Sequence, residues 1–173
     1  MQTGRDIMSP KAKISKRVED YGYFRLSKLS DAKILAKTLR FEDKREIISA
    51  SGNTPLMAIS NGISESTLCF TICNVQNIPI AIFGVNVFGA IWFLATPELE
   101  KISIPFLREC RGVVNNFHKT YPLLWNYVDA RNTLHIKWLK FCGFKFIRKL
   151  NYGVLNKPFY EIAKLCVNQQ QPY

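Results

Sequence analysis

The sequence predicts a mixed α+β domain, and three of its features carry that prediction. Apolar runs over residues 67–74, 78–85 and 90–95 are joined by turns too short to hold a helix, which indicates an antiparallel meander. Apolar residues recur at helical spacing both before and after this meander. A strand–helix–strand unit over residues 123–144 then follows.

The segment before the meander predicts one strand and a group of helices. Residues 21–26 alternate as a strand does. Ser30 is a suitable N-cap for a helix with an apolar stripe over residues 32–39. Residues 41–48 continue as a charged helix, and Pro55 suits the first turn of another short helix.

The segment after the meander predicts a helix and then the strand–helix–strand unit. Ser103 can cap a helix that runs to about His118. Residues 123–128 form an apolar strand. Asn132 stands where the next helix begins, and Gly143 stands where a C-cap glycine ends one. The apolar stripe expected along that helix consists of Leu134, Trp138, Leu139 and Phe141. Two further strands are expected over residues 145–150 and 158–163.

Length and charge limit the organisation and the partners. A chain of 173 residues with 47% hydrophobic content is long enough to bury one core. We expect a basic N-terminal arm over residues 1–20, one domain over 21–166 and a polar tail over 167–173. The sequence shows no secretory signal and no continuous membrane span, and its cysteines and histidines lack metal-ligand spacing.

Part of the net charge of +11 is concentrated toward the C-terminus. Between Arg131 and Lys164, eight Lys or Arg residues stand against the single Glu161. Such a basic face attracts an anionic partner such as nucleic acid, whereas a solvated surface is the plainer interpretation.

The order of elements and one motif resemble the GNAT (Gcn5-related N-acetyltransferase) family. Residues 24–36, FRLSKLSDAKILA, look like the opening strand and first helix of such domains. Asn132 is followed eleven and twelve residues later by Gly143 and Phe144, as in the family's N…GF motif. The resemblance implies a three-layer α/β/α fold with a mixed central sheet, an antiparallel N-terminal meander and splayed strands four and five.

A narrower resemblance is to the small GNAT-like proteins of T7-like tailed phages. It rests on FEDKREIISASG, PLMAIS, IPIAIFGV, AIWFLATPEL and above all LLWNYVDARNTLHIKWLKFCGF. That group is associated with virion assembly or the internal virion core. This resemblance implies virion proteins as partners and a location in the host cytoplasm or the virion.

The GNAT resemblance also implies acetyl-CoA as cofactor. The backbone of Phe93, Leu94 and Ala95 would pair with the pantetheine amides like an added strand. The helix that begins after Ser103 would direct its N–H groups at the pyrophosphate, and Asn132 would bind the pantetheine region.

Two positions depart from the family. The glycine-containing phosphate loop falls on Glu100, Ser103 and Pro105, so neither glycine is present and an acid replaces the usual Arg or Gln. Leu139 stands seven residues after Asn132, where many members have a Tyr that protonates the leaving thiolate. These changes predict a weakened or lost cofactor site.

No catalytic set is evident. Asp129, at the end of the fifth strand, is the best carboxylate candidate, although an Asp there is also typical of a helix cap. Tyr127 is the nearest alternative proton donor. The GNAT resemblance places Asp43, Arg45 and Glu46 on the helices that border the acceptor-substrate cleft, whereas a solvated helix face is the default expectation for them.

Two hypotheses of function therefore stand side by side. The first is an acetyl-CoA-dependent N-acetyltransferase of phage type with a degenerate phosphate loop, acting on an amine or protein acceptor. The alternative is a non-catalytic virion-assembly or internal virion protein built on the same fold. A third, a nucleic-acid-binding module, is favoured by the basic C-terminal third alone.

Overall fold

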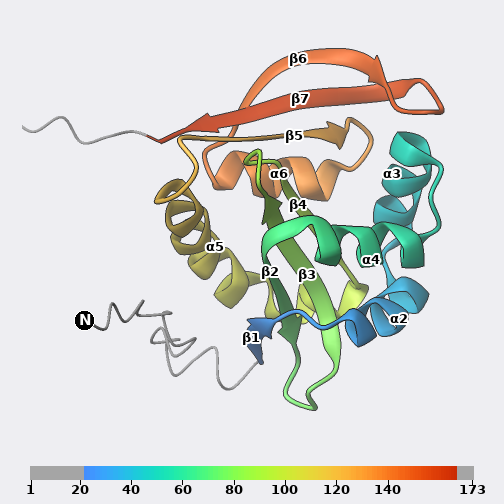
Figure 1. The fold of residues 1–173 in the computed structure, drawn as a ribbon, viewed down its shortest axis with the longest axis vertical. Helices are drawn as coiled ribbons and strands as arrows, with labels where there is room; N and C mark the ends of the chain where they lie inside the picture. Colours follow the sequence, from blue (N-terminus) through green and yellow to red (C-terminus); the bar gives the residue numbers. More distant parts are fainter. Residues whose placement is uncertain (1–21, 167–173) are drawn as a thin grey trace, which may run out of the picture.

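The computed structural model describes residues 22–166, with the backbone alone described for residues 103–107. The basic arm and the polar tail expected from the sequence lie outside the described residues. Figure 1 shows two sheets with helices packed around them. One is a four-stranded sheet of order β1-β2-β3-β4, and the other is a three-stranded sheet of order β5-β7-β6.

The four-stranded sheet contains the expected meander. Its strands are β1 (Tyr23–Leu26), β2 (Ser66–Cys73), β3 (Pro79–Asn86) and β4 (Ile91–Ala95), and all neighbours are antiparallel. The β3–β4 turn contains Gly89 at a φ of 76°, a left-handed conformation that favours glycine. The prediction of three strands joined by short turns is confirmed, with bounds that differ by about one residue.

The three-stranded sheet has its last strand in the middle. It consists of β5 (Leu123–Asp129), β6 (Lys145–Tyr152) and β7 (Lys157–Leu165), and β7 pairs antiparallel with both neighbours. Both C-terminal strands are longer than the sequence predicted.

Among residues 22–166, the backbones of the two sheets pair where β4 and β5 begin. Ala90 forms a parallel bridge with Trp125, and the Trp125 N–H donates to the Gly89 carbonyl at 3.2 Å. The Asn126 side-chain amide also donates to the Ile91 carbonyl. Beyond this point β4 and β5 belong to separate sheets and diverge. The splayed fourth and fifth strands expected from the family resemblance are therefore present.

Helices cover both faces of the four-stranded sheet (Figure 1). On one face lie α2 (Leu29–Thr38), α3 (Phe41–Ser51) and α4 (Pro55–Glu65), whose core includes Leu35, Ile59 and Ile82. On the other lie α5 (Ser103–His118) and α6 (Thr133–Phe141), whose core includes Phe83 and Val114. A 3-10 helix, η1 (Pro97–Ile102), leads from β4 into α5. Two cores on opposite faces make the three layers that were predicted.

Two local predictions about helices were wrong. Ser30 lies inside α2, because Lys28 is the N-cap and its backbone N–H donates to the Asp31 carboxylate at 2.9 Å. The apolar stripe of α6 was right for Leu139, which is buried, and for Trp138, which packs against the core. It was wrong for Leu134 and Phe141, which are 47% and 38% exposed. The buried positions of α6 are His135 and Leu139.

The ends of α6 agree with the sequence. Asn132 is the N-cap, and its side chain accepts the His135 N–H at 3.4 Å. Gly143 follows the C-cap residue with a φ of 84°. Within residues 22–166, no helix is long and apolar enough to cross a membrane.

Candidate functional site

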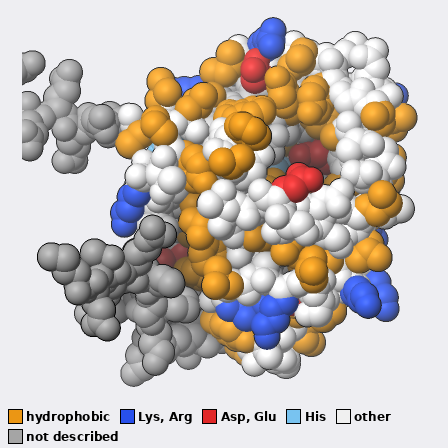
Figure 2. Space-filling view, viewed as in Figure 1, with side chains coloured by type: hydrophobic (Ala, Val, Ile, Leu, Met, Phe, Trp, Pro, Cys, Tyr) orange, Lys and Arg blue, Asp and Glu red, His pale blue; other side chains and the backbone are white. Residues whose placement is uncertain are grey.

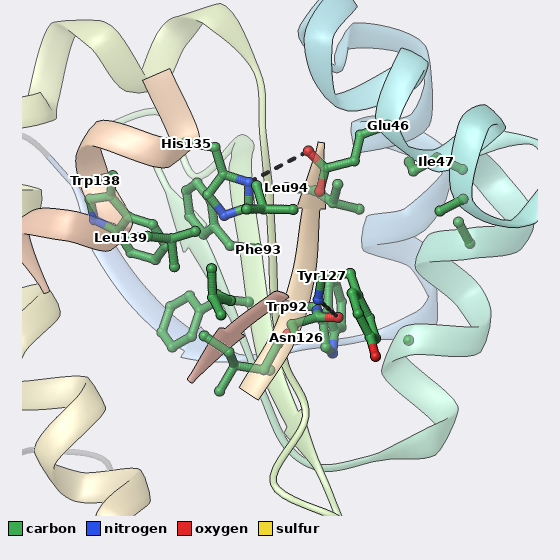
Figure 3. Close-up of a pocket in the computed structure, with 18 of the residues that line it drawn as sticks. Glu46, Ile47, Trp92, Phe93, Leu94, Asn126, Tyr127, His135, Trp138 and Leu139 are labelled. Atoms are coloured by element: carbon green, nitrogen blue, oxygen red, sulfur yellow. Dashed lines mark hydrogen bonds and ion pairs between the residues drawn. The ribbon is translucent and has the colours of Figure 1, made fainter. Parts of the chain in front are cut away.

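A cleft of about 420 Å³ opens where β4 and β5 diverge (Figure 3). It lies between α3 and α4 on one side and α5 and α6 on the other. Figure 2 shows the mouth as a hollow with acidic side chains at and inside its rim. The lining includes Glu46, Ala58, Trp92, Phe93, Leu94, Val114, Tyr127, His135 and Leu139.

The end of β4 beside the cleft is bonded to α3. The Ala95 N–H donates to Asp43 Oδ2 at 2.8 Å, and the Ala95 carbonyl accepts the Arg40 N–H at 2.9 Å. Arg40 also holds the Asp43 carboxylate through Nε and Nη2 at 2.9 to 3.1 Å. Asp43 is 1% exposed. The start of α3 thus takes both backbone groups of Ala95, as an added strand would.

Asn132 joins α6 to the same network. Its side-chain amide donates to Asp43 Oδ1 and to Glu46 Oε2, both at 3.0 Å, and its oxygen caps α6. The residue is fully buried. Because each polar atom of the Asn132 side chain already has a protein partner, the motif asparagine ties α3, β4 and α6 together.

His135 and Glu46 face each other across the cleft (Figure 3). His135 Nδ1 lies 3.8 Å from Glu46 Oε2, which is an ion-pair distance but too long for a hydrogen bond. Nδ1 is buried and has no hydrogen-bond partner within the described part of the chain. The aromatic rings of Phe93 and Trp138 flank the imidazole at centroid distances of 5.9 and 5.7 Å.

Asp129 forms ion pairs with two arginines. It is fully buried, and Arg131 binds both carboxylate oxygens at 2.6 and 2.8 Å, while Arg45 lies 3.9 Å away. Burial alone would raise the pKa of Asp129, but the hydrogen bonds and charge of Arg131 outweigh burial and hold that pKa below its ordinary value. A carboxylate held in this way is a weak base. It does not cap α6, since Asn132 does.

The ring of Tyr127 stacks on the ring of Tyr152. Its ring lies 4.2 Å from that of Tyr152, at an interplanar angle of 14°. Burial, and then Tyr127, raise the pKa of the Tyr152 phenol, so Tyr152 is un-ionised at neutral pH. The pair forms part of the cleft wall.

The segment from β4 to α5 has no glycine. Thr96 is buried, and its carbonyl accepts the Leu99 N–H at 3.2 Å at the start of η1. Glu100 is exposed on η1 and adds a negative charge there. Ser103 begins α5 and Pro105, in its first turn, has no N–H to donate.

Comparison with known proteins supports the fold and a phage connection. Residues 69–150 match the family model described as Bacteriophage T7, probable scaffold protein Gp13. The probable scaffold protein gp13 of Escherichia phage T7 is 29% identical over 109 residues, which span 58% of this chain and 78% of that protein. This similarity supports a link to T7-like phages.

Solved structures similar to this chain include acetyltransferases. The ribosomal-protein-S18-alanine N-acetyltransferase of Escherichia coli has a TM-score of 0.61 at 13% identity, covering 88% of this chain and 99% of that one. AAC(6')-Ib in complex with ribostamycin and coenzyme A has a TM-score of 0.62 at 12% identity, covering 89% and 100%. This chain has the GNAT fold. At such low identity the likeness concerns the fold and not the reaction.

The residues of this GNAT domain fit acetyl-CoA poorly. Phe93 and Leu94 line the cleft, and their pairing with the arm of the cofactor stays a prediction. Ala95, however, has its N–H and carbonyl bonded to Asp43 and Arg40, and Asn132 is turned toward two carboxylates. At the phosphate end, Glu100 adds a negative charge and Pro105 has no N–H to donate.

The prediction of a solvated charged face on α3 was wrong for Asp43, so the sequence did not reveal the contact between α3 and β4. Asp43 was expected on a solvated face but is buried. Its partners Ala95 and Asn132 lie 52 and 89 residues away in the sequence, so no local pattern reveals the contact. The signal available was the spacing of Arg40 and Asp43, which favours an ion pair on one helical turn.

Proposed function

We propose that this chain is a non-catalytic assembly protein of T7-like phages, built on the GNAT fold. One observation carries the proposal: the start of α3 occupies the edge of β4 where an acyl-CoA arm would pair. Opening that edge would strip Asp43 of its bond to the Ala95 amide and leave a buried carboxylate less well satisfied, which costs about 1–3 kcal/mol. The molecule gains stability by keeping the edge closed.

Two further features support the proposal. Leu139 is 1% exposed and lines the cleft where many family members have a proton donor. The two weak catalytic candidates, Asp129 and Tyr127, are engaged by arginines and by a stacked tyrosine. The partners in this proposal are other virion proteins, met in the host cytoplasm during assembly or in the particle.

The test is an infection with a T7-like phage whose copy of this gene is deleted. We expect defective or non-infectious particles, and rescue when the wild-type chain is supplied from a plasmid. Mass spectrometry of the particle proteins should show the same acetylation with and without the chain. Normal infectivity without the chain, or acetylated sites that depend on it, would contradict the proposal.

An acetyltransferase remains a second candidate, because the cleft between the splayed strands contains a buried histidine beside a carboxylate, His135 and Glu46. The test is the release of free thiol from acetyl-CoA in the presence of mixed peptides and polyamines. A rate above that of a heat-denatured sample, and lowered by Glu46→Gln, would establish this candidate. We expect no such rate.

A further inference from the structure

Among the described residues, no lysine or arginine lines the cleft, although the molecule as a whole is basic. Two glutamates, Glu46 and Glu65, are among its lining residues, and none of those residues is Lys or Arg, although the chain carries 24 of them. Arg131 interacts electrostatically with Glu46 but is bound to both oxygens of Asp129. The residues that line the cleft therefore carry a net negative charge, which attracts a cation.

The polar groups inside the cleft need a donor. Oε2 of Glu46 contacts Asn132 and faces His135, whereas Oε1 has no hydrogen-bond or ion-pair partner within residues 22–166. His135 Nδ1 has no hydrogen-bond partner among the described residues, and the residue is 9% exposed. A nitrogen that carries two hydrogens can lie about 2.9 Å from both Nδ1 and Glu46, because these atoms are 3.8 Å apart.

The walls of the cleft are flat and fixed in place. The indole N–H of Trp92 donates to Ser66 at 2.8 Å, and its ring lies so close to Gly62 that an added Cβ would approach it to 2.8 Å. Tyr127 and Tyr152 stack on each other at 4.2 Å. Aromatic faces held in this way bind planar cations without an ordering cost.

We propose that the cleft binds an arginine side chain of a protein partner, with the guanidinium between Glu46 and His135 and its face on the aromatic wall. This inference rests on the proposed assembly function, which leaves the cleft available to a protein partner. Arginine fits better than lysine because its planar group offers several N–H donors at once and stacks on aromatic rings. A lysine ammonium satisfies the charge but does not use the flat walls.

The experiment is a titration of the full chain, followed by NMR, with the capped peptide acetyl-Gly-Arg-Gly-amide. The matched peptides contain citrulline, which has the same shape without the charge, or lysine. We expect the arginine peptide to shift the signals of His135 and the Trp92 indole at about millimolar concentrations, while those of His118 stay in place. The citrulline peptide should leave all of them unchanged, and the lysine peptide should bind several-fold more weakly.

Two variants locate the binding. Glu46→Gln keeps the shape of the side chain and should weaken binding of the arginine peptide at least about tenfold. Glu100→Gln removes the same charge from an exposed position outside the cleft and should leave binding unchanged. Thermal unfolding of Glu46→Gln, compared with the wild type, shows that weaker binding does not come from a failure to fold. If Glu46→Gln proves unfolded, an arginine peptide that carries a nitroxide is added to the wild type instead. The NMR signals that this peptide broadens locate the site.

Several results would overturn the inference: no shift up to about 20 mM peptide, equal binding by Glu46→Gln and the wild type, broadening away from the cleft, or lysine binding as well as arginine. None of these outcomes requires acetyl-CoA to bind. Failure of the arginine site is thus distinguishable from failure of the proposed function, which the infection and acetyl-CoA experiments decide.

Discussion

At the scale of single residues, Asp43 sets what the edge of β4 can bind. Its carboxylate receives the Ala95 amide, the Arg40 guanidinium and the Asn132 side chain while 1% exposed. A buried carboxylate is tolerated only when such donors satisfy it. The same donors are then lost to any ligand, so one side chain couples the stability of the fold to the closure of the cofactor edge.

Asn132→Ala tests this network. The substitution removes the N-cap of α6 and the amide that donates to the buried Asp43 and the half-buried Glu46 carboxylates. We therefore expect the free energy of unfolding to fall by about 2–4 kcal/mol. Urea denaturation measures it. Asn115→Ala, on an exposed position of α5, serves as the control and should change stability by less than about 0.5 kcal/mol. Equal effects of the two variants would contradict the network.

The pH dependence of stability tests the Asp129–Arg131 pair. The pKa of Asp129 is lower in the folded state than the ordinary value of about 3.9, so between the two values the unfolded chain binds more protons. The pair therefore stabilises the fold fully above about pH 4, and this contribution is lost as the pH falls through the folded pKa. We expect the advantage of the wild type over Asp129→Asn to shrink on acidification in urea titrations. A gap that widens toward acid would refute the assignment.

At the scale of elements, the β6–β7 turn fixes α3 in position. The N–H groups of Val154 and Leu155 donate to the carbonyls of Ala50 and Ser49, both at 3.2 Å. An added Cβ at Gly153 would lie 2.3 Å from the Ser49 carbonyl oxygen, so the close approach requires glycine. The last hairpin of the chain thus supports the helix that closes the edge of β4.

Gly153→Ala tests this docking against a matched glycine. Gly143 has a similar positive φ, but its nearest non-local atom is the flexible end of Lys164 at 3.4 Å. Gly143→Ala should lower the free energy of unfolding by about 1 kcal/mol, from backbone strain alone. Gly153→Ala should cost more, about 2–4 kcal/mol, because backbone atoms must move. Thermal or urea unfolding compares the two variants. Equal losses of stability would show that the turn does not pack closely against α3.

The elements also show what the sequence could and could not predict. Strand and helix ends marked by local chemistry, such as Asn132, Gly89 and Gly143, were predicted to within a residue or so. The inward face of α6 was predicted only in part: Leu139 is buried as expected, but the burial of His135 was missed because it depends on Phe93 and Glu46 from distant segments. The closed edge of β4 escaped prediction for the same reason, since it depends on which helix packs against the strand.

At the scale of the whole molecule, charge is divided between the cleft and the C-terminal unit. Exposed lysines and arginines lie on α6, β6 and β7, among them Lys137, Lys140, Lys145 and Lys149, whereas the cleft carries two glutamates. Binding of nucleic acid to the basic surface stays a prediction, and it requires an affinity that falls steeply with salt. The separation of charge gives one chain an acidic cleft and a basic surface.

The central claim is that this GNAT domain keeps the fold and has closed the cofactor edge with its own helix. Isothermal titration calorimetry of the full chain with acetyl-CoA tests it most directly, with an active GNAT acetyltransferase as positive control. The closed edge at Ala95 predicts no binding heat up to about 1 mM acetyl-CoA. A dissociation constant below about 100 μM would contradict the claim, because it would mean that α3 gives way to the cofactor.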